Sequence, residues 1–325
     1  MYASVSGRIC DSVSSFEKRG LLYCPKSQTT TRACRVRVRS GMLVEPMPGL
    51  FARTEYWEQT KPWTRPYRII RSLACAHPEW IFASFSAACI YGLPVSVELL
   101  DRIHIAVSNG AHSGKKGLIV RHPIALDGAY RVMGVRVTSF ERTVVDCMRA
   151  APFPEALAIA DGALRLRDWP QAHLVDLTEH HGAYRPGIRQ ARRVARYADA
   201  RAESGGESVA RGVMIEEGFA VPDLQTVLPN VLDSNYPFRV DGTWRTDDGR
   251  LIAFEMDGEE KYRSFASRHG GDVVRRMMKE RQREALLTAA CDGLVRFDFD
   301  IVKTPGALAR LLDSYGVPRT PSGLT

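Results

Sequence analysis

A serine followed by two glycines, Ser204 to Gly206, breaks the chain soon after the arginine-rich segment Pro186 to Arg201, which has helical character. Clusters of glycine and serine mark loops between folded segments. The length of 325 residues suits two or three domains, because a domain takes about 150 residues. We therefore expect residues 1–203 and 204–325 to fold separately, since each part contains enough apolar sequence for a core.

A weaker break lies between Thr60 and Pro66, where the prolines disfavour a helix. The two breaks divide the chain into residues 1–60, 61–203 and 204–325. The expected fold class is therefore a multidomain protein of the α+β or α/β type. In the middle part, helical sequence and short β-like runs are mixed. The expected helices cover residues 67–76, 140–149, 155–167 and 171–180, and the expected strands cover residues 103–107, 118–122 and 132–137.

Apolar residues make up 45% of the chain and charged residues 25%, which excludes a wholly disordered chain and a collagen-like fibre. The seven cysteines are scattered and form no CxxC pair, which favours reduced thiols over zinc. The first ten residues lack the apolar segment of a signal peptide, so we expect a cytoplasmic protein. The uncharged run from Trp80 to Val97 is interrupted by serines and by Gly92. It predicts a buried helix over Trp80 to Tyr91 and no membrane span.

The charge is distributed unevenly. Residues 1–60 hold nine basic and five acidic residues, residues 61–200 hold 19 and 12, and residues 201–325 hold 17 and 20. The net charges are therefore +4, +7 and −3. A basic part followed by an acidic one is typical of proteins that meet a polyanion, although solubility alone also explains such charge.

The N-terminal part contains a basic segment, Thr29 to Ser40, with four arginines and no acid. The next segment, Gly41 to Ala52, predicts a hairpin of two apolar strands around a turn of proline and glycine. A helix beside such a hairpin is what a winged helix-turn-helix requires for reading duplex DNA. The alternation of arginine and valine from residue 35 to 39 instead favours a strand. The candidate DNA-binding residues are Arg32, Arg35, Arg37 and Arg39; a solvated basic face is the alternative.

Three segments together resemble the actinobacterial AbiEi-type antitoxins: Lys18 to Arg53, FASFSAACIYGLPVS at residues 82–96, and VTSFERTVVDCMRAAPFPEALAIADGALR at residues 137–165. The resemblance implies a winged-helix end that represses its own operon, with the four arginines on or just after the recognition helix. It also implies a nucleotidyltransferase-like toxin as partner. Residues 1–17 do not show two clear helices, which departs from that pattern.

The C-terminal part has a regular order of expected elements. A helix over Glu207 to Glu217 precedes strands over 223–228, 238–244 and 251–257. Asp247 to Gly249 predicts a hairpin between the last two strands. A charged helix over 272–290, a strand over 294–299 and a helix over 304–315 follow. The order αβββαβ is therefore expected, with a final helix.

Three carboxylates lie on these strands, where acidic residues are depleted. Asp241 is in the second strand, and Glu255 and Asp257, two residues apart on the third, share one face. Clustered like charges are costly unless a cation joins them. Mg²⁺ binds oxygen ligands of this kind, so the sequence predicts a magnesium site at Asp241 and Glu255.

The segments GESVAR, FRVDGTW, FEMDGEEKYR and KERQREALL, at residues 206–211, 238–244, 254–263 and 279–287, resemble a domain of unknown function related to very-short-patch-repair endonucleases. This domain belongs to the PD-(D/E)XK superfamily. The resemblance implies that Asp241 and Glu255 hold Mg²⁺, which activates a water for attack on the phosphodiester. The lysine expected two residues after Glu255 is replaced by Asp257. Either Lys261 supplies the amine from a displaced position, or the site is inactive.

Glu207 matches the acid of the first helix in that family and is a candidate extra ligand. A glutamate in the first turn is also favoured by the helix dipole alone. Arginines of the charged helix over 272–290 either face DNA phosphates or form ordinary pairs with Glu280 and Glu284.

Three functions remain open from the sequence. The first is a DNA-binding regulator of the AbiEi antitoxin type fused to a nuclease-fold domain. The second is an active Mg²⁺-dependent DNA endonuclease of repair or defence, with catalytic residues Asp241, Glu255, Asp257, Lys261 and Glu207. The third is a protein-binding module whose nuclease fold is degenerate.

Overall fold

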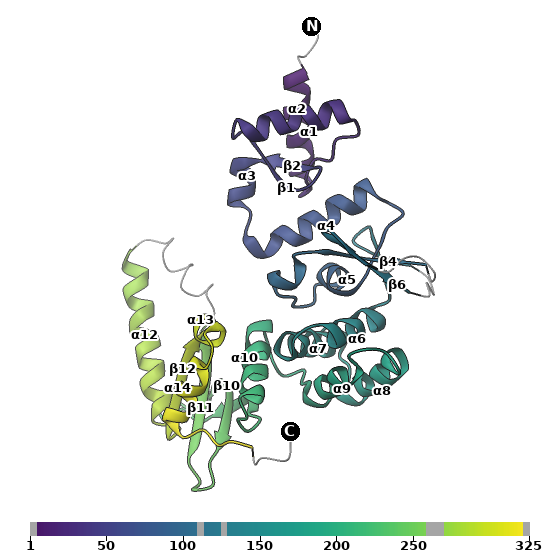
Figure 1. The fold of residues 1–325 in the computed structure, drawn as a ribbon. Helices are drawn as coiled ribbons and strands as arrows, with labels where there is room; N and C mark the ends of the chain where they lie inside the picture. Colours follow the sequence, from purple (N-terminus) through teal and green to yellow (C-terminus); the bar gives the residue numbers. More distant parts are fainter. Residues whose placement is uncertain (1–4, 109–113, 125–128, 258–269, 321–325) are drawn as a thin grey trace. The chain divides into compact units, whose positions relative to one another are not determined.

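The computed structural model describes residues 5–108, 114–124, 129–257 and 270–320. The protein is of the mixed α/β type, with helices and strands in both halves of the chain (Figure 1). The chain divides into two compact units, Met1–Cys147 and Met148–Thr325. Within the part of the chain that the structure describes, no helix has both the length and the apolar character needed to cross a membrane.

The first unit begins with two helices and a hairpin. These are α1 (Val5–Lys18), α2 (Gln28–Arg39), β1 (Leu43–Met47) and β2 (Leu50–Arg53). The strands β1 and β2 pair antiparallel, and Tyr23 adds an isolated bridge to Phe51. The hairpin expected from Gly41 to Ala52 is therefore confirmed. A small core joins these elements; it is formed by Ile9, Val13, Cys34, Leu43 and Phe51.

A six-stranded sheet forms the rest of the first unit, in the order β5-β6-β4-β3-β8-β7. Its strands are β3 (Ile81–Phe82), β4 (Ile103–Val107), β5 (Gly114–Lys116), β6 (Ile119–Pro123), β7 (Tyr130–Val132) and β8 (Val135–Val137). The helical elements around it are α3 (Thr54–Gln59), η1 (Pro62–Thr64), α4 (Arg65–Ala76), α5 (Ser84–Tyr91), η2 (Val97–Leu100) and α6 (Phe140–Ala150), which runs across the division between the units.

Two sequence expectations change in this unit. The helix expected over Trp80 to Tyr91 begins only at Ser84, because Ile81 and Phe82 pair with β4 and β8 as a central strand. Its end is as expected, since Gly92 caps it with a φ of 79°. The single strand expected over 132–137 is a hairpin, which turns at Met133 and Gly134, both with positive φ.

The second unit contains a helical part and a four-stranded sheet. The helical part is α7 (Phe153–Arg167), α8 (Gln171–Gly182) and α9 (Ile188–Tyr197). The elements that follow are α10 (Gly205–Glu216), β9 (Asp223–Leu228), β10 (Phe238–Arg245), β11 (Leu251–Asp257), α12 (Gly270–Thr288), β12 (Gly293–Asp298), α13 (Phe299–Lys303) and α14 (Ala307–Tyr315). This order agrees with the expected αβββαβ order, with the extra short helix α13.

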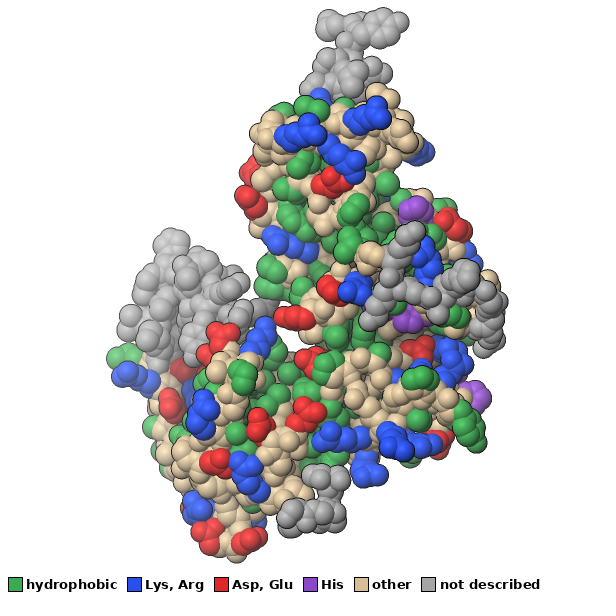
Figure 2. Space-filling model, in the orientation of Figure 1, with side chains coloured by type: hydrophobic (Ala, Val, Ile, Leu, Met, Phe, Trp, Pro, Cys, Tyr) green, Lys and Arg blue, Asp and Glu red, His purple; other side chains and the backbone are tan. Residues whose placement is uncertain are grey.

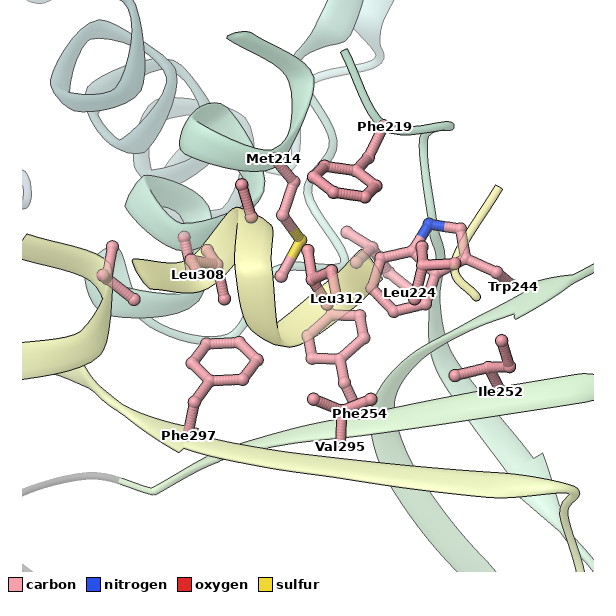
Figure 3. Close-up of a cluster of buried hydrophobic side chains, with 14 of the residues drawn as sticks. Met214, Phe219, Leu224, Trp244, Ile252, Phe254, Val295, Phe297, Leu308 and Leu312 are labelled. Carbon is pink, nitrogen blue, oxygen red and sulfur yellow. The ribbon is translucent and has the colours of Figure 1, made fainter. Parts of the chain in front are cut away.

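The sheet of this unit has the order β12-β11-β10-β9, in which β11 and β12 are parallel and the other pairs antiparallel. One face packs on α10 and α14 through a cluster that includes Met214, Trp244, Phe254 and Leu312 (Figure 3). The other face contacts α12 through Leu287. The strand carboxylates lie at residues 241, 255 and 257 of this sheet.

The break expected at Ser204 to Gly206 does not separate the two compact units. Ser204 caps α10 by accepting a hydrogen bond from Glu207 N, and Gly205 and Gly206 form the first turn of that helix. At Gly212, an added Cβ would lie 2.5 Å from Pro154 Cα, so α10 packs closely on α7. Serine and glycine are common in linkers, but here they begin a helix. The sequence near residue 204 does not reveal that this helix packs on α7, earlier in the chain.

Candidate nucleic-acid interface and carboxylate cluster

The arginine-rich segment forms the helix α2, although its alternating arginines and valines favour a strand. Ser27 begins the helix by accepting a hydrogen bond from Thr30 N at 3.1 Å. Cys34 is fully buried, and Val38 packs against the same small core. Burial of positions four residues apart requires the helical period, so packing against α1 and the hairpin outweighs the local β pattern.

The opposite face of α2 is exposed. Gln28, Arg32, Arg35, Val36 and Arg39 lie there, three or four residues apart, and each is exposed. Val36 keeps 59% of its surface accessible. Lys and Arg side chains gather over α1 and α2 on the face that Figure 2 shows. All four arginines lie on α2, and three of them, Arg32, Arg35 and Arg39, are on one outward face.

Two of the four arginines have contacts within the protein. Arg35 forms an ion pair with Glu45 of β1 at 3.0 Å, and this hydrogen bond holds the pKa of Glu45 below its ordinary value. Arg37 is partly buried and donates from Nη1 to Ala33 O at 2.7 Å. Arg37 thus turns back along its own helix, whereas Arg32 and Arg39 extend into solvent.

The hairpin beside α2 is held in place by α1. The turn between β1 and β2 contains Gly49 with a φ of 84°, a conformation that glycine adopts without strain. Glu17, which is 6% exposed, accepts hydrogen bonds from Arg53 N at 2.8 Å and Arg53 Nε at 2.6 Å. The hairpin and the exposed face of α2 therefore form one ordered surface.

The carboxylates of the C-terminal sheet are paired with arginines. Parallel pairing of β11 and β12 places Glu255 opposite Arg296. Glu255 is 9% exposed and contacts Arg283 of α12, whose Nη1 lies 2.7 Å from Oε1. Arg296 Nε lies 4.0 Å from the other carboxylate oxygen. Two guanidinium groups thus supply the positive charge that a buried carboxylate requires.

Asp257 belongs to the same cluster. Arg296 donates from Nη2 to Asp257 Oδ1 at 2.7 Å and to Glu280 Oε1 at 3.0 Å. Glu284 Oε2 lies 3.8 Å from Arg296 Nη1. Burial lowers the pKa of Arg296, but its hydrogen bond to Asp257 and the nearby carboxylates outweigh that effect and raise the pKa overall. Arg296 therefore stays charged and links both strands to α12.

The other expected site residues lie in different surroundings. Asp241 Oδ2 accepts a hydrogen bond from Met256 N at 2.7 Å, which brings Asp241 next to the Glu255–Asp257 segment. Glu207 lies in the first turn of α10. Its carboxylate accepts hydrogen bonds from Glu203 N, just before the helix, and from Gln225 Nε2 at 3.4 Å. Lys261 lies outside the described residues.

The contacts of Glu255 argue against the magnesium site expected at Asp241 and Glu255. Mg²⁺ takes near-octahedral oxygen ligands and keeps several waters, whereas the oxygens of Glu255 and Asp257 are directed to guanidinium groups. A divalent cation beside Arg283 and Arg296 would be repelled by both. Among the residues that the structure describes, no group of three His, Cys, Asp or Glu side chains could hold a metal ion.

Sequence reasoning missed Arg296, which makes the most contacts in this cluster. The signal was an arginine inside an apolar strand, in the run GLVRFD of β12, where a charge is unusual. Arg283 was expected only as one charge among several on α12. Its role depends on the contact between α12 and the sheet, which the local sequence does not reveal.

Comparison with known proteins finds relatives of this chain but does not assign the chain to a family. The chain is 34% identical over 175 residues to two proteins of Mycobacterium tuberculosis, "Uncharacterized protein Rv2248" (strain ATCC 25618 / H37Rv) and "Uncharacterized protein MT2308" (strain CDC 1551 / Oshkosh). The matched region covers 52% of this chain and 59% of each relative, so the chain spans less than two thirds of their length. No family model matches the chain.

Proposed function

We propose that the protein is a DNA-binding regulator that inserts the exposed face of α2 into the major groove of duplex DNA. The observation that carries this proposal is the row of exposed arginines at residues 32, 35 and 39 beside an ordered hairpin. The 12 residues of α2 span about 18 Å. The major groove is about 12 Å wide and accepts an α-helix.

The residues of this face suit two kinds of contact. Guanidinium groups bind phosphates, and a guanidinium also bonds guanine through two acceptors in the major groove. Val36, exposed between Arg32 and Arg39, offers an apolar surface for a thymine methyl group. Arg35 exchanges its contact with Glu45 for a DNA phosphate when the helix docks.

The resemblance to AbiEi-type antitoxins supports a regulator that represses its own operon, with a nucleotidyltransferase-like toxin as the protein partner. In this proposal the C-terminal domain has a nuclease-like order of elements but does not cleave DNA. The arginine pairing of Glu255 and Asp257 supports that view. Cleavage with Mg²⁺ remains the alternative prediction from the sequence.

The proposal is tested by replacing Arg32, Arg35 and Arg39 with glutamine in the full chain. Binding to a duplex that contains the gene's own upstream region is measured by fluorescence anisotropy at several KCl concentrations. We expect weaker binding and a salt slope reduced by up to about 3, because each lost phosphate contact lowers it by about 0.9. Replacement by lysine should restore most of the slope, since lysine keeps the charge.

The matched control removes three exposed arginines elsewhere, at Arg245, Arg250 and Arg310. This variant loses the same net charge, so it should bind DNA nearly as the wild type does. An α2 variant with unchanged affinity and slope would exclude α2 as the DNA-binding helix. An equal loss of affinity in both variants would show that DNA binding depends on net charge alone and not on α2.

A further inference from the structure

A second basic surface lies on α9, in the other unit of the chain. Residues 183–201 contain six arginines and one acid. The helix packs on α7 and α8 and buries Ala191, Val194 and Ala195. Arg189, Arg192 and Arg196, three and four residues apart, lie on its exposed side. With the exposed Arg185 just before the helix, they form a basic stripe of four residues.

Most of this charge has no partner among the residues that the structure describes. Within the described part of the chain, the guanidinium groups of Arg185, Arg189 and Arg196 form no hydrogen bond or ion pair. Arg192 instead forms two hydrogen bonds with Glu179 of α8, at 2.6 and 2.7 Å. Three positive charges of the stripe therefore remain uncompensated, and on Figure 2 blue side chains gather along the edge of α8 and α9.

The hollow between α8 and α9 does not explain the stripe. It has a volume of about 370 Å³ and is lined by Glu179 and Thr178 as well as Arg192 and Arg196. The Glu179 carboxylate, whose hydrogen bonds from Arg192 keep its pKa below the ordinary value, would repel a small anion there. The charge therefore suits an extended polyanion that lies along the outside of the helix.

We propose that the α9 stripe binds the phosphate backbone of duplex DNA, independently of sequence. The inference rests on the proposed function, in which the same chain binds DNA through α2. Arg189, Arg192 and Arg196 lie about 4.5 and 6 Å apart along the axis of α9. Duplex DNA carries one negative charge per about 1.7 Å of its axis, so its charge is dense enough to offer phosphates to each arginine of the stripe. A lipid surface suits α9 less, because its apolar side is buried within the unit.

The test uses the full chain and a duplex of random sequence, with binding measured against KCl concentration. Changing Arg185, Arg189 and Arg196 to glutamine should weaken binding severalfold and lower the salt slope by up to about 3. Changing Glu179 to glutamine should have the opposite effect, because it frees Arg192 and should raise the slope by about 1. This gain cannot result from misfolding, and circular dichroism checks whether the triple variant remains folded.

The outcomes separate the two proposals. If the α2 variant loses affinity while both α9 variants keep the wild-type slope, the α9 inference is wrong and the proposed function stands. If only the α9 variants change, DNA binding depends on α9 and the proposed role of α2 is wrong. If the α9 variant keeps its DNA slope but loses binding to phosphatidylserine vesicles, the stripe binds lipid and the inference is overturned.

Discussion

Asp161 and Arg211 form an ion pair whose side chains are 0% and 2% exposed. Arg211 Nη2 donates to Asp161 Oδ2 at 2.7 Å, and Nη1 donates to Tyr197 O at 2.6 Å. The other oxygen of Asp161 accepts from Asp199 N at 2.8 Å. Burial raises the pKa of Asp161, although Arg211 opposes that effect. The pair joins α7, α10 and the end of α9, and every partner it uses lies in the second unit.

We expect Arg211→Met to lower the free energy of unfolding by about 3–5 kcal/mol, because it leaves a buried carboxylate without its cation. Urea denaturation of the full chain measures this loss. The double variant Asp161→Leu with Arg211→Met should lose less than Arg211→Met alone, since it leaves neither charge unpaired. The exposed variant Arg250→Met is the control. A loss below about 1 kcal/mol in Arg211→Met would show that the pair contributes no more than a surface contact.

At the scale of single elements, the carboxylate cluster depends on three of them. β11 presents Glu255 and Asp257, β12 presents Arg296 directly opposite, and α12 contributes Arg283 and Glu280. Alone, β11 would carry two like charges without a partner. Alone, β12 would carry an arginine in an apolar strand. With α12 in place, Arg283 and Arg296 supply positive charge beside Glu255 and Asp257.

We expect Arg296→Gln to lower the free energy of unfolding by about 1.5–3 kcal/mol, because two partly buried carboxylates lose their shared charged donor. Millimolar MgCl₂ should restore part of the melting temperature of this variant, since the metal then supplies the missing charge. The wild type should show no more change than in NaCl of equal ionic strength. A Mg²⁺-dependent rise in the wild type that disappears in Asp241→Ala would instead establish the metal site expected from the sequence.

For the whole molecule, the structure locates the division between compact units at Cys147 and Met148 and not at Ser204. The sheet of residues 223–298 is joined to the preceding helices by α10, which packs closely on α7 at Gly212. Ala202, which precedes the break, belongs to the same buried cluster as Met214 and Phe254. Ala202 and Met214, on either side of residue 203, therefore share one buried cluster.

We expect a fragment of residues 151–325 to be monomeric and to melt cooperatively, because it keeps α7 and the Asp161–Arg211 pair. A fragment of residues 204–325 should melt at a lower temperature and associate, since it exposes the face of α10 that packs on α7. Circular dichroism and size-exclusion chromatography compare the two. Equal melting temperatures and a monomeric shorter fragment would show that the break at Ser204 is a domain boundary after all.

Local sequence determined the features that short-range physics controls. The hairpin of β1 and β2 turns at Gly49, Gly92 ends α5, and strand alternation places Glu255 and Asp257 on one face. The tertiary structure alone decided that residues 35–39 are helical, because Cys34 is buried against α1 and the hairpin. It alone also paired Arg296 with Glu255, 41 residues earlier, and joined α10 to α7. Such contacts depend on which distant segments pack together, and no local period or propensity encodes that choice.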